Sequence, residues 1–539
     1  MHTDRFTPLD AATLLRWMRH DLPNKQLFGI GRGLFFMPEQ GDPFRMERYG
    51  KVLETPLGVA AGPHTQLAQN ILSAWLCGAR YIELKTVQVL DELNVTKPCI
   101  DMADEGYNCE WSQELKLDQS FEEYLKAFVL LYVLRDMLNL PVETEPGKGP
   151  GFIFNMSAGY NLEGIRSPAV QRFLDRMENA EEGVKRIKAE LAPLYPAIEK
   201  MPIPARLSDN LTVSTMHGCP PDEVESIGRY FITERKYNTT IKLNPTLLGP
   251  ERLRDILNTQ LGYGVRVPDE AFGHDLKYND GVAIIRNLAA AAEAAGVAFG
   301  LKLTNTLETA NEEQNLPRSE GMVYMSGRAL HPISINLAER LQQEFDGALD
   351  IAFSAGADTF NVTDTLACGL RPITMSSDIL KPGGYGRLHQ YLGTLRNDMR
   401  KAGAHSLAEL EKSRSPLAGN PGFANRQLRR RHPRQAQPLP QGTFPLRFGQ
   451  DRTPASAFRL RRRALHVGLS GGAEHPPLSG RRGPGRFQAG VGGHHRHEPV
   501  PEHSGHGLQP SVPEPVHPHQ LRQAAHDPRG QAFRGRKDG

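Results

Sequence analysis

Short apolar runs alternate with helical patterns from about residue 55 to residue 402. Each run has the length of a buried strand, and the segments between the runs carry apolar residues at helical spacing. Eight strands, each followed by a helix, favour a (β/α)8 barrel over an open doubly wound sheet. The strand candidates are Leu57–Ala61, Tyr81–Thr86, Phe152–Met156, Leu211–Thr215, Thr240–Leu243, Phe299–Thr304, Leu349–Phe353 and Pro372–Ser376. The helical patterns include Thr65–Cys77, Asp222–Glu234, Asp280–Ala295, Leu337–Phe345 and Tyr385–Ala402.

The pattern divides the chain into three parts. We predict an N-terminal extension over 1–50, a barrel over 51–410 and a tail over 411–539. Two longer insertions, at about 88–150 and 306–330, follow strand ends on the face where barrel enzymes carry lids and partner surfaces. No G-x-G-x-x-G follows a strand, so the chain lacks the nicotinamide-binding fingerprint.

The tail differs from the rest in composition. After Lys412 there is no Ile, Tyr, Trp, Met or Cys, and 20 arginines stand against one lysine. Such a segment forms no packed core and is expected to be disordered. One reading is an arginine-rich arm for acidic partners. We favour the other, a frameshifted tail, because Arg, Pro, Gly, Ala and His are what a GC-rich gene yields out of frame.

Charge and cysteine content exclude several classes of protein. Residues 1–412 hold 43 Lys and Arg against 54 Asp and Glu, so the barrel part is acidic and offers no support for nucleic-acid binding. No signal peptide opens the chain and no apolar run approaches 18 residues, so we expect a cytoplasmic protein without a membrane anchor. The five cysteines contain no C-x-x-C, which argues against disulfides, zinc and iron–sulfur clusters within this chain.

Unusual residues follow the first two strands. Gly58-Val59-Ala60-Ala61-Gly62-Pro63 lets a flat ligand approach the backbone, and Ile82-Glu83-Leu84-Lys85-Thr86 places a cation at the next strand end. Lys242 ends the fifth strand, so two lysines can face an anionic ring. Small residues after strands seven and eight present N–H groups to a phosphate. The alternative is a tight turn beside a lysine that reaches out of the sheet to water.

Longer motifs carry a resemblance. The chain resembles the FMN barrel of dihydroorotate and dihydropyrimidine dehydrogenases at Lys85-Thr86, Asn155-Met156-Ser157, Lys242-Leu243-Asn244-Pro245, Thr304-Asn305-Thr306 and Ser326-Gly327-Arg328-Ala329. It is also similar to the N-terminal part of the selenate reductase flavoprotein subunit, at Ala60–Asn70, Ser214–Pro221 and Asp378–Tyr385. That similarity covers about residues 5–410 and implies a TIM barrel of the dihydroorotate dehydrogenase type.

The resemblance implies roles for individual residues. The implied FMN contacts are Ala61, Gly62, Lys85, Thr86, Lys242, Thr304, Ser326, Gly327, Gly356, Ser376 and Ser377. The implied substrate contacts are Asn155, Asn161, Asn305 and Thr306. Cys219 falls near the loop thiol that moves a proton while flavin moves hydride, and His217 is the second candidate. Thr212 stands where pyrimidine-reducing relatives have a substrate-binding asparagine, which weakens the case for a pyrimidine substrate.

Three functions follow as hypotheses. The first is an FMN-dependent oxidoreductase acting on a small planar substrate, with iron–sulfur clusters, FAD and NAD(P) only in missing downstream domains or a redox partner protein. The second is a catalytically silent barrel that serves as the scaffold of a redox complex. The third is a flavin-free lyase or aldolase with Lys85 or Lys242 as its Schiff-base lysine. No metal site is expected, and a homo-oligomer stays open.

Overall fold

The computed structural model of the chain describes residues 6–39, 41–87, 99–105, 107–108, 115–214, 217–312, 316 and 320–414. The predicted tail lies outside the described residues from 415 onward, as do Cys109 and Trp111. None of the helices in these ranges combines the length and the apolar character that crossing a bilayer requires.

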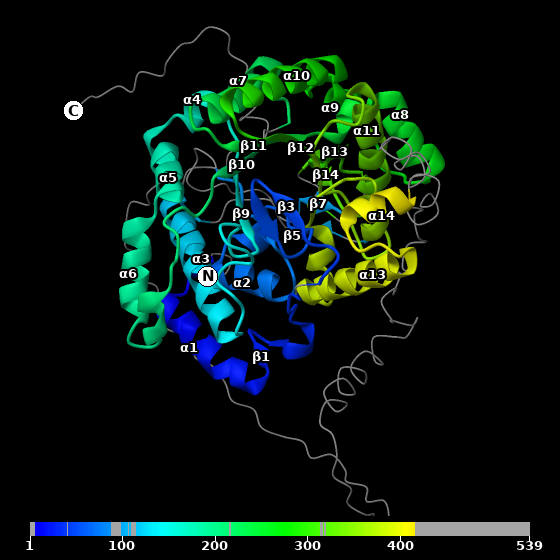
Figure 1. The fold of residues 1–539 in the computed structure, drawn as a ribbon. Coiled ribbons are helices and arrows are strands. Elements are labelled where there is room, and N and C mark those ends of the chain that lie inside the picture. Colours follow the sequence, from blue (N-terminus) through cyan, green and yellow to red (C-terminus); the bar gives the residue numbers. More distant parts are fainter. Residues whose placement is uncertain are drawn as a thin grey trace, which may run out of the picture. The chain divides into compact units, whose positions relative to one another are not determined.

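Eight parallel strands close into a barrel (Figure 1). Their order around the barrel is β10-β11-β12-β15-β16-β5-β6-β9. All eight predicted strands are confirmed, with ends shifted by up to three residues. The strands are β5 (Leu57–Val59), β6 (Tyr81–Glu83), β9 (Ile153–Ala158), β10 (Asn210–Val213), β11 (Asn238–Leu243), β12 (Phe299–Leu303), β15 (Ile351–Phe353) and β16 (Ile373–Met375).

Helices surround the barrel and bury one face of each strand (Figure 1). The predicted helices between strands are confirmed, although the helix expected from Leu337 begins at Leu330. The principal helices are α1 (Ala11–Asp21), α2 (Ala68–Leu76), α3 (Leu117–Met137), α5 (Pro168–Glu178), α6 (Glu181–Leu191), α7 (Pro221–Thr233), α10 (Tyr278–Ala295), α11 (Leu330–Glu344), α13 (Arg387–Ala402) and α14 (Leu407–Arg414). The shorter helices are α4 (Leu162–Ile165), α8 (Pro250–Arg254), α9 (Asp269–His274) and α12 (Val362–Ala367).

One prediction about the insertions was wrong. The segment 88–150 is not an insertion throughout, because its α3 is the barrel helix between β6 and β9. Fifteen of the 21 residues of α3 are buried, since α2, α5 and α6 all pack against it. A helix that is covered on most sides lacks the one-sided apolar stripe by which a surface helix is identified.

Described residues from both insertions form one small sheet. After β6 come β7 (Ile100–Asp101) and β8 (Tyr107–Asn108), and after β12 come β13 (Leu307–Ala310) and β14 (Met322–Met325). The sheet order is β13-β14-β7-β8, with Tyr324 opposite Ile100 and Met325 opposite Asp101. Both connections leave the barrel at carboxyl ends of its strands, so this sheet belongs to the face where the predicted site lies.

A hairpin of β3 (Met46–Arg48) and β4 (Lys51–Leu53) lies at the opposite end of the barrel. The Tyr49 hydroxyl lies 3.2 Å from Thr240 Oγ1 on β11, and Lys51 Nζ contacts Asp209 Oδ2 at 2.8 Å. These contacts join residues 46–53 to the amino-terminal ends of the strands. Tyr49, at the end of the predicted extension, therefore contacts the barrel, and Lys51 opens the predicted barrel segment.

Candidate active site

A charged pair lies inside the barrel near the carboxyl ends of the strands. Lys242 and Lys302 are partners in the register of β11 and β12, and Lys302 Nζ forms an ion pair with Glu83 Oε2 on β6. Glu83 also accepts hydrogen bonds from the Ala61 N–H (3.2 Å) and the Thr374 hydroxyl (3.4 Å). The Glu83 and Lys302 side chains are 1% and 3% exposed. Glu83 therefore connects the backbone just after β5 to Lys302 on β12, across the barrel.

Lys242 is different, because no carboxylate forms an ion pair with it within the described part of the chain. Burial, and then repulsion from Lys302 and Lys85, lower the pKa of Lys242 to about 7, while Glu83 opposes the shift. A lysine in this state gains a proton readily when an anion approaches. The site is thus prepared for a negatively charged ligand group.

His64 follows the first strand end and is 5% exposed. Neither ring nitrogen of His64 has a hydrogen-bond partner of good geometry. Burial lowers the pKa of His64 to about 4, although the Ala60 backbone opposes the shift. Lys85 and Lys302 contribute in the same direction as burial, so the imidazole is neutral. A Cβ at Gly62 would lie 2.5 Å from His64 Cε1. A larger residue at 62 would therefore require the His64 ring to shift, and the role of Gly62 in ligand clearance stays a prediction.

Asn155 lies beside Glu83 in the register of β6 and β9 and is fully buried. Its Nδ2 donates to the Thr212 hydroxyl at 2.8 Å, and its Oδ1 has no partner. Thr212, the residue that departs from the pyrimidine-reducing pattern, therefore orients Asn155. A buried amide oxygen without a donor is a group that a ligand N–H or O–H can satisfy.

Four predicted FMN contacts come together after β14, β15 and β16. The Ser326 and Ser377 hydroxyls lie 2.8 Å apart. Gly327 and Gly356 both have positive φ, at 83° and 56°. A Cβ at Gly356 would lie 2.4 Å from the Gly327 carbonyl oxygen. Only glycine at 356 permits this close packing of the loops after β14 and β15, and we refer to the four residues as the cradle.

A carboxylate occupies this cradle. Glu105, at the end of the short helix η4 (Ala103–Glu105), accepts a hydrogen bond from the Arg328 backbone N–H at 3.0 Å and forms an ion pair with Lys381. A Cβ at Gly327 would lie 2.9 Å from Glu105 Oε2. The cradle can therefore bind an anion, which is the requirement for a phosphate.

Other predicted ligand contacts bond to neighbouring protein groups. The Thr86 hydroxyl lies 2.8 Å from Ser157 Oγ, and the Thr304 hydroxyl 2.9 Å from Ser334 Oγ on α11. Ser376 is the residue before the short helix η8 (Ser377–Leu380). Through these hydrogen bonds Thr86 connects the end of β6 to β9, and Thr304 connects the end of β12 to α11.

Two of the predicted substrate contacts bond within their own loops. Asn161 Oδ1 accepts from the Gly164 N–H at 2.9 Å and caps α4. Asn305 Oδ1 accepts from the Thr306 N–H at 3.1 Å. A substrate contact from Asn161 would have to come from its amide nitrogen, because its oxygen serves the helix.

The loop after β10 carries both catalytic candidates. His217 Nδ1 lies 3.1 Å from Asp275 Oδ2, and the Thr246 hydroxyl donates to the same oxygen at 2.7 Å. The Gly218 N–H donates to Asp275 Oδ1 at 3.1 Å. A carboxylate only accepts hydrogen bonds, so His217 Nδ1 carries the proton of the neutral ring and Nε2 is left as the base. His217 Nε2 is buried without a partner. The His217 ring stacks on the Tyr324 ring, with 5.6 Å between the ring centroids.

The environments of the two candidates differ. Burial works against the Asp275 carboxylate, yet His217, Thr246 and Gly218 hold the pKa of Asp275 below its usual value. Burial, together with Glu223 and Asp222, raises the pKa of the Cys219 thiol to about 12. The thiol is thus held in its protonated form, whereas the imidazole is oriented by a charged partner.

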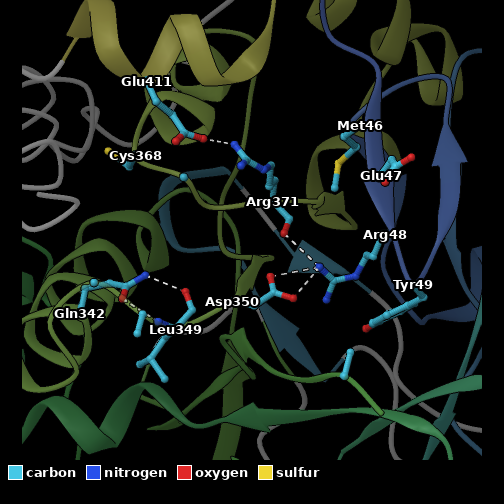
Figure 2. Close-up of a pocket in the computed structure, with 14 residues that line it drawn as sticks. Met46, Glu47, Arg48, Tyr49, Gln342, Leu349, Asp350, Cys368, Arg371 and Glu411 are labelled. Carbon is cyan, nitrogen blue, oxygen red and sulfur yellow. Dashed lines mark hydrogen bonds and ion pairs between the residues drawn. The ribbon is translucent and has the colours of Figure 1, made fainter. Parts of the chain in front are cut away.

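A separate pocket of about 470 Å³ lies at the amino-terminal end of the strands (Figure 2). Its charged groups are paired, with Arg48 Nη1 at 3.1 Å from Asp350 Oδ2, and Arg371 in an ion pair with Glu411 on α14. The lysines and the phosphate cradle lie at the other end, so this pocket is not part of the candidate site.

Sequence reasoning missed Glu83, Lys302, His64, Asp275 and Glu105. Glu83 and Lys302 interrupt apolar strand runs, and a charge at an inward-facing strand position is a signal that could have marked them. Asp275 lies 58 residues after its partner His217. Neither Asp275 nor Glu105 follows a strand directly, and the sequence offers no signal for either.

Comparisons with known proteins place the chain in a family. The model for "Oxidoreductase YgfK, N-terminal TIM-barrel domain" matches residues 28–418. The YgfK oxidoreductases named for Escherichia coli K12 and for Escherichia coli O157:H7 are each 45% identical over 384 residues. These alignments cover 68% of this chain and 36% of each relative, so the chain spans about a third of the length of the curated relatives it matches.

Among solved structures, the chain is similar to ligand-free DHODH of Eimeria tenella and to DHODH of the same organism in complex with ferulenol. Both matches have 16% sequence identity and a TM-score of 0.41. They cover 74% and 76% of this chain, and 97% and 96% of the respective DHODH chains. The family match, over residues 28–418, extends over more than half of this chain. The chain belongs to the family of N-terminal TIM-barrel domains of the YgfK oxidoreductases.

Proposed function

We propose that the barrel binds FMN at the carboxyl ends of its strands and is the hydride-transfer module of a longer oxidoreductase. The observation that carries this proposal is the state of Lys242, a buried lysine without an ion pair in the described chain and with a pKa lowered to about 7. When bound, FMN supplies reversible hydride transfer together with a ring that becomes electron-rich on reduction. Lys242 supplies the positive charge for that ring, and the neighbouring Lys302 is neutralised by its ion pair with Glu83.

The donor set fits FMN at both of its ends. The ring end has Lys242 beside the Glu83–Lys302 pair and the buried oxygen of Asn155. The phosphate end has the cradle after β14, β15 and β16, which already accepts a carboxylate. We assign the small planar substrate to the space next to Asn155, with Asn305 and Thr306 as further contacts.

The proton-transfer group is assigned to His217, and Cys219 becomes the second candidate. Hydride and proton must reach opposite ends of one double bond, so a positioned acid or base is needed. His217 holds its Nδ1 proton toward Asp275 and leaves Nε2 to exchange a proton. A thiol with a pKa of about 12 is a poor base at neutral pH.

The assignment predicts a single tautomer for His217. In ¹⁵N-histidine NMR spectra at pH 8, we expect His217 to appear as the Nδ1–H form in the wild type. In Asp275→Asn the amide can donate to the ring, and the signal is expected to move toward the Nε2–H form or toward a mixture.

Iodoacetamide labelling provides the control on the thiol. Cys219 is expected to react about 100-fold more slowly at pH 8 than an exposed thiol of ordinary pKa, with Cys219→Ser identifying its signal. An Nε2–H tautomer in the wild type, or rapid alkylation of Cys219, would show that Cys219 and not His217 is the better candidate for the proton-transfer group.

The flavin itself is tested by reconstitution. The purified chain is incubated with excess FMN, passed through a desalting column and examined for a flavin absorbance band and for quenched flavin fluorescence. We expect a yellow protein with about one FMN per barrel. A colourless protein with an intact far-UV circular dichroism spectrum would refute the proposal and support the scaffold hypothesis.

In this proposal, turnover with a pyridine nucleotide requires the additional sequence that the longer relatives have. The barrel has no dinucleotide fingerprint, and the chain spans only 36% of each curated relative. We assign the iron–sulfur clusters, FAD and NAD(P) site to the remaining portion or to a partner protein. We therefore expect FMN binding by this chain with little NADPH oxidation.

A second candidate function is favoured by the same lysine. A pKa of about 7 leaves a substantial fraction of Lys242 as a free amine at neutral pH, as a Schiff-base lysine requires. Borohydride trapping with a set of small aldehydes and ketones tests this reading. A stable adduct that mass spectrometry locates at Lys242 would establish carbonyl chemistry.

A further inference from the structure

The phosphate end of the site holds a negatively charged side chain of the protein itself. Glu105 binds the Arg328 backbone N–H through one carboxylate oxygen and the Lys381 ammonium through the other. Its side chain is 9% exposed. Lys381 also contacts Asp378 Oδ1 at 3.0 Å. The Arg328 N–H and the Lys381 ammonium beside the cradle therefore both have carboxylate partners.

We propose that Glu105 is a built-in competitor for the phosphate group, which closes the cradle in the free protein and must leave when a phosphate-bearing ligand binds. This inference rests on the proposed flavin function, because it concerns the regulation of the same site. It makes Glu105 a determinant of affinity for FMN and of no consequence for riboflavin, which lacks the phosphate.

Space is the first argument. Glu105 Oε2 approaches Gly327 so closely that an added Cβ there would lie 2.9 Å from it. Gly356 closes the other side, since a Cβ there would lie 2.4 Å from the Gly327 carbonyl oxygen. A cradle that is too tight for one extra methyl group cannot hold a carboxylate and a phosphate together.

Charge is the second argument. Asp358 and Asp378 lie near Glu105, against the cations Lys381 and Arg387. Burial, and then Asp378, raise the pKa of Asp358 to about 6, and Glu105 adds to this effect. The three carboxylates already outnumber the two cations, so a phosphate is accommodated only if a carboxylate withdraws.

The backbone beneath Glu105 allows the side chain to move alone. The Ser326 N–H donates to the Asp101 carbonyl at 2.7 Å, and the Ala103 N–H donates to Asp101 Oδ1 at 2.7 Å. Asp101 thereby holds the segment on β14 without help from the Glu105 carboxylate. Rotation of one side chain exposes the Arg328 N–H and Lys381 and leaves the β7–β14 pairing in place.

Binding of FMN and riboflavin to the wild type, Glu105→Ala and Glu105→Gln tests the inference. Fluorescence titrations are run at one ionic strength, with Glu181→Ala as an exposed control far from the cradle in sequence. We expect Glu105→Ala to bind FMN at least about tenfold more tightly, equivalent to about 1.4 kcal/mol. We expect riboflavin affinity to be unchanged, with Glu105→Gln intermediate for FMN.

A second test, the phosphate arm, uses inorganic phosphate and is independent of flavin binding. Phosphate is expected to raise the melting temperature of Glu105→Ala more than that of the wild type, with sodium chloride as the ionic-strength control. If FMN binds the wild type and Glu105→Ala equally, or binds Glu105→Ala less tightly, the inference is wrong and the flavin proposal stands. If no variant binds either flavin, the flavin proposal fails, and the phosphate arm then decides whether Glu105 guards an anion site.

Discussion

Replacing Lys242 with methionine is expected to stabilise the ligand-free barrel at pH 7 while it weakens FMN binding. The lowered pKa means that the folded state binds fewer protons on this group than the unfolded state does between about pH 7 and pH 10.5. Stability therefore rises with pH across this window in the wild type, and it is lowest below pH 7, where the buried lysine is charged. Methionine removes this dependence and is expected to add about 2–5 kcal/mol at pH 7.

The same variant loses the charge opposite the ring. We expect FMN affinity to fall by about 10- to 100-fold, and the midpoint potential of bound FMN to fall by about 30–60 mV, because one cation no longer stabilises the reduced ring. Urea unfolding at several pH values measures the first effect, and flavin titration with spectroelectrochemistry measures the second. A lower stability with unchanged FMN affinity would show that Lys242 is a structural residue.

Lys302→Met is the matched control, since the two lysines are partners in the register of adjacent strands. Here the expected sign is the opposite, because methionine leaves Glu83 as a buried carboxylate without its partner. A loss of about 3–5 kcal/mol follows from breaking a buried ion pair on one side only. The same substitution, Lys to Met, is thus expected to raise stability at Lys242 and to lower it at Lys302. This difference distinguishes a lysine that serves a ligand from one that serves the fold.

Replacing Glu54 with glutamine is expected to lower the free energy of unfolding by about 3–5 kcal/mol. Glu54 accepts from Arg80 Nε at 2.5 Å and from Arg135 Nη1 at 2.9 Å, and all three side chains are at most 3% exposed. Glutamine keeps the shape but leaves two buried guanidinium groups without a counter-charge. Arg80 stacks 4.3 Å from the buried Trp75 ring, so tryptophan fluorescence reports the unfolding directly.

The control for Glu54 is a carboxylate of the same type on the surface. Glu181 forms an ion pair with Lys185 at 2.9 Å, but both side chains are more than half exposed. Glu181→Gln is expected to leave the free energy of unfolding nearly unchanged, because water and salt screen an exposed pair. Similar losses for Glu54→Gln and Glu181→Gln would mean that burial of the Glu54 cluster does not contribute as described.

The barrel could be predicted from the sequence because buried parallel strands appear as compact apolar runs with turns at regular intervals. All eight strands and five of the helices, α2, α7, α10, α11 and α13, follow from this pattern. Helix α3 was missed because it is covered on most sides, so its sequence has no polar face to reveal it. The membership in a TIM-barrel family of oxidoreductases agrees with the resemblance, while the link to selenate reductase stays a prediction.

The site was predictable only in part. The serines and glycines of the phosphate cradle stand out because each follows a strand, and the structure brings Ser326, Ser377, Gly327 and Gly356 together. Their role in FMN binding stays a prediction. The groups that sequence reasoning missed act through partners from distant segments, as Asp275 does for His217 and Glu83 for Lys302. Such pairs are created by barrel closure, which no local pattern encodes.

The small sheet β13-β14-β7-β8 joins the connections after two barrel strands that are far apart in sequence. Strand β14 of one connection pairs with strand β7 of the other, so neither connection can be exchanged without leaving the other's strand edge unpaired. A chimera that takes only one of them from a distant relative would leave a strand edge unpaired above the site. The two segments are therefore expected to vary together among family members, and a swap that keeps function has to exchange both at once.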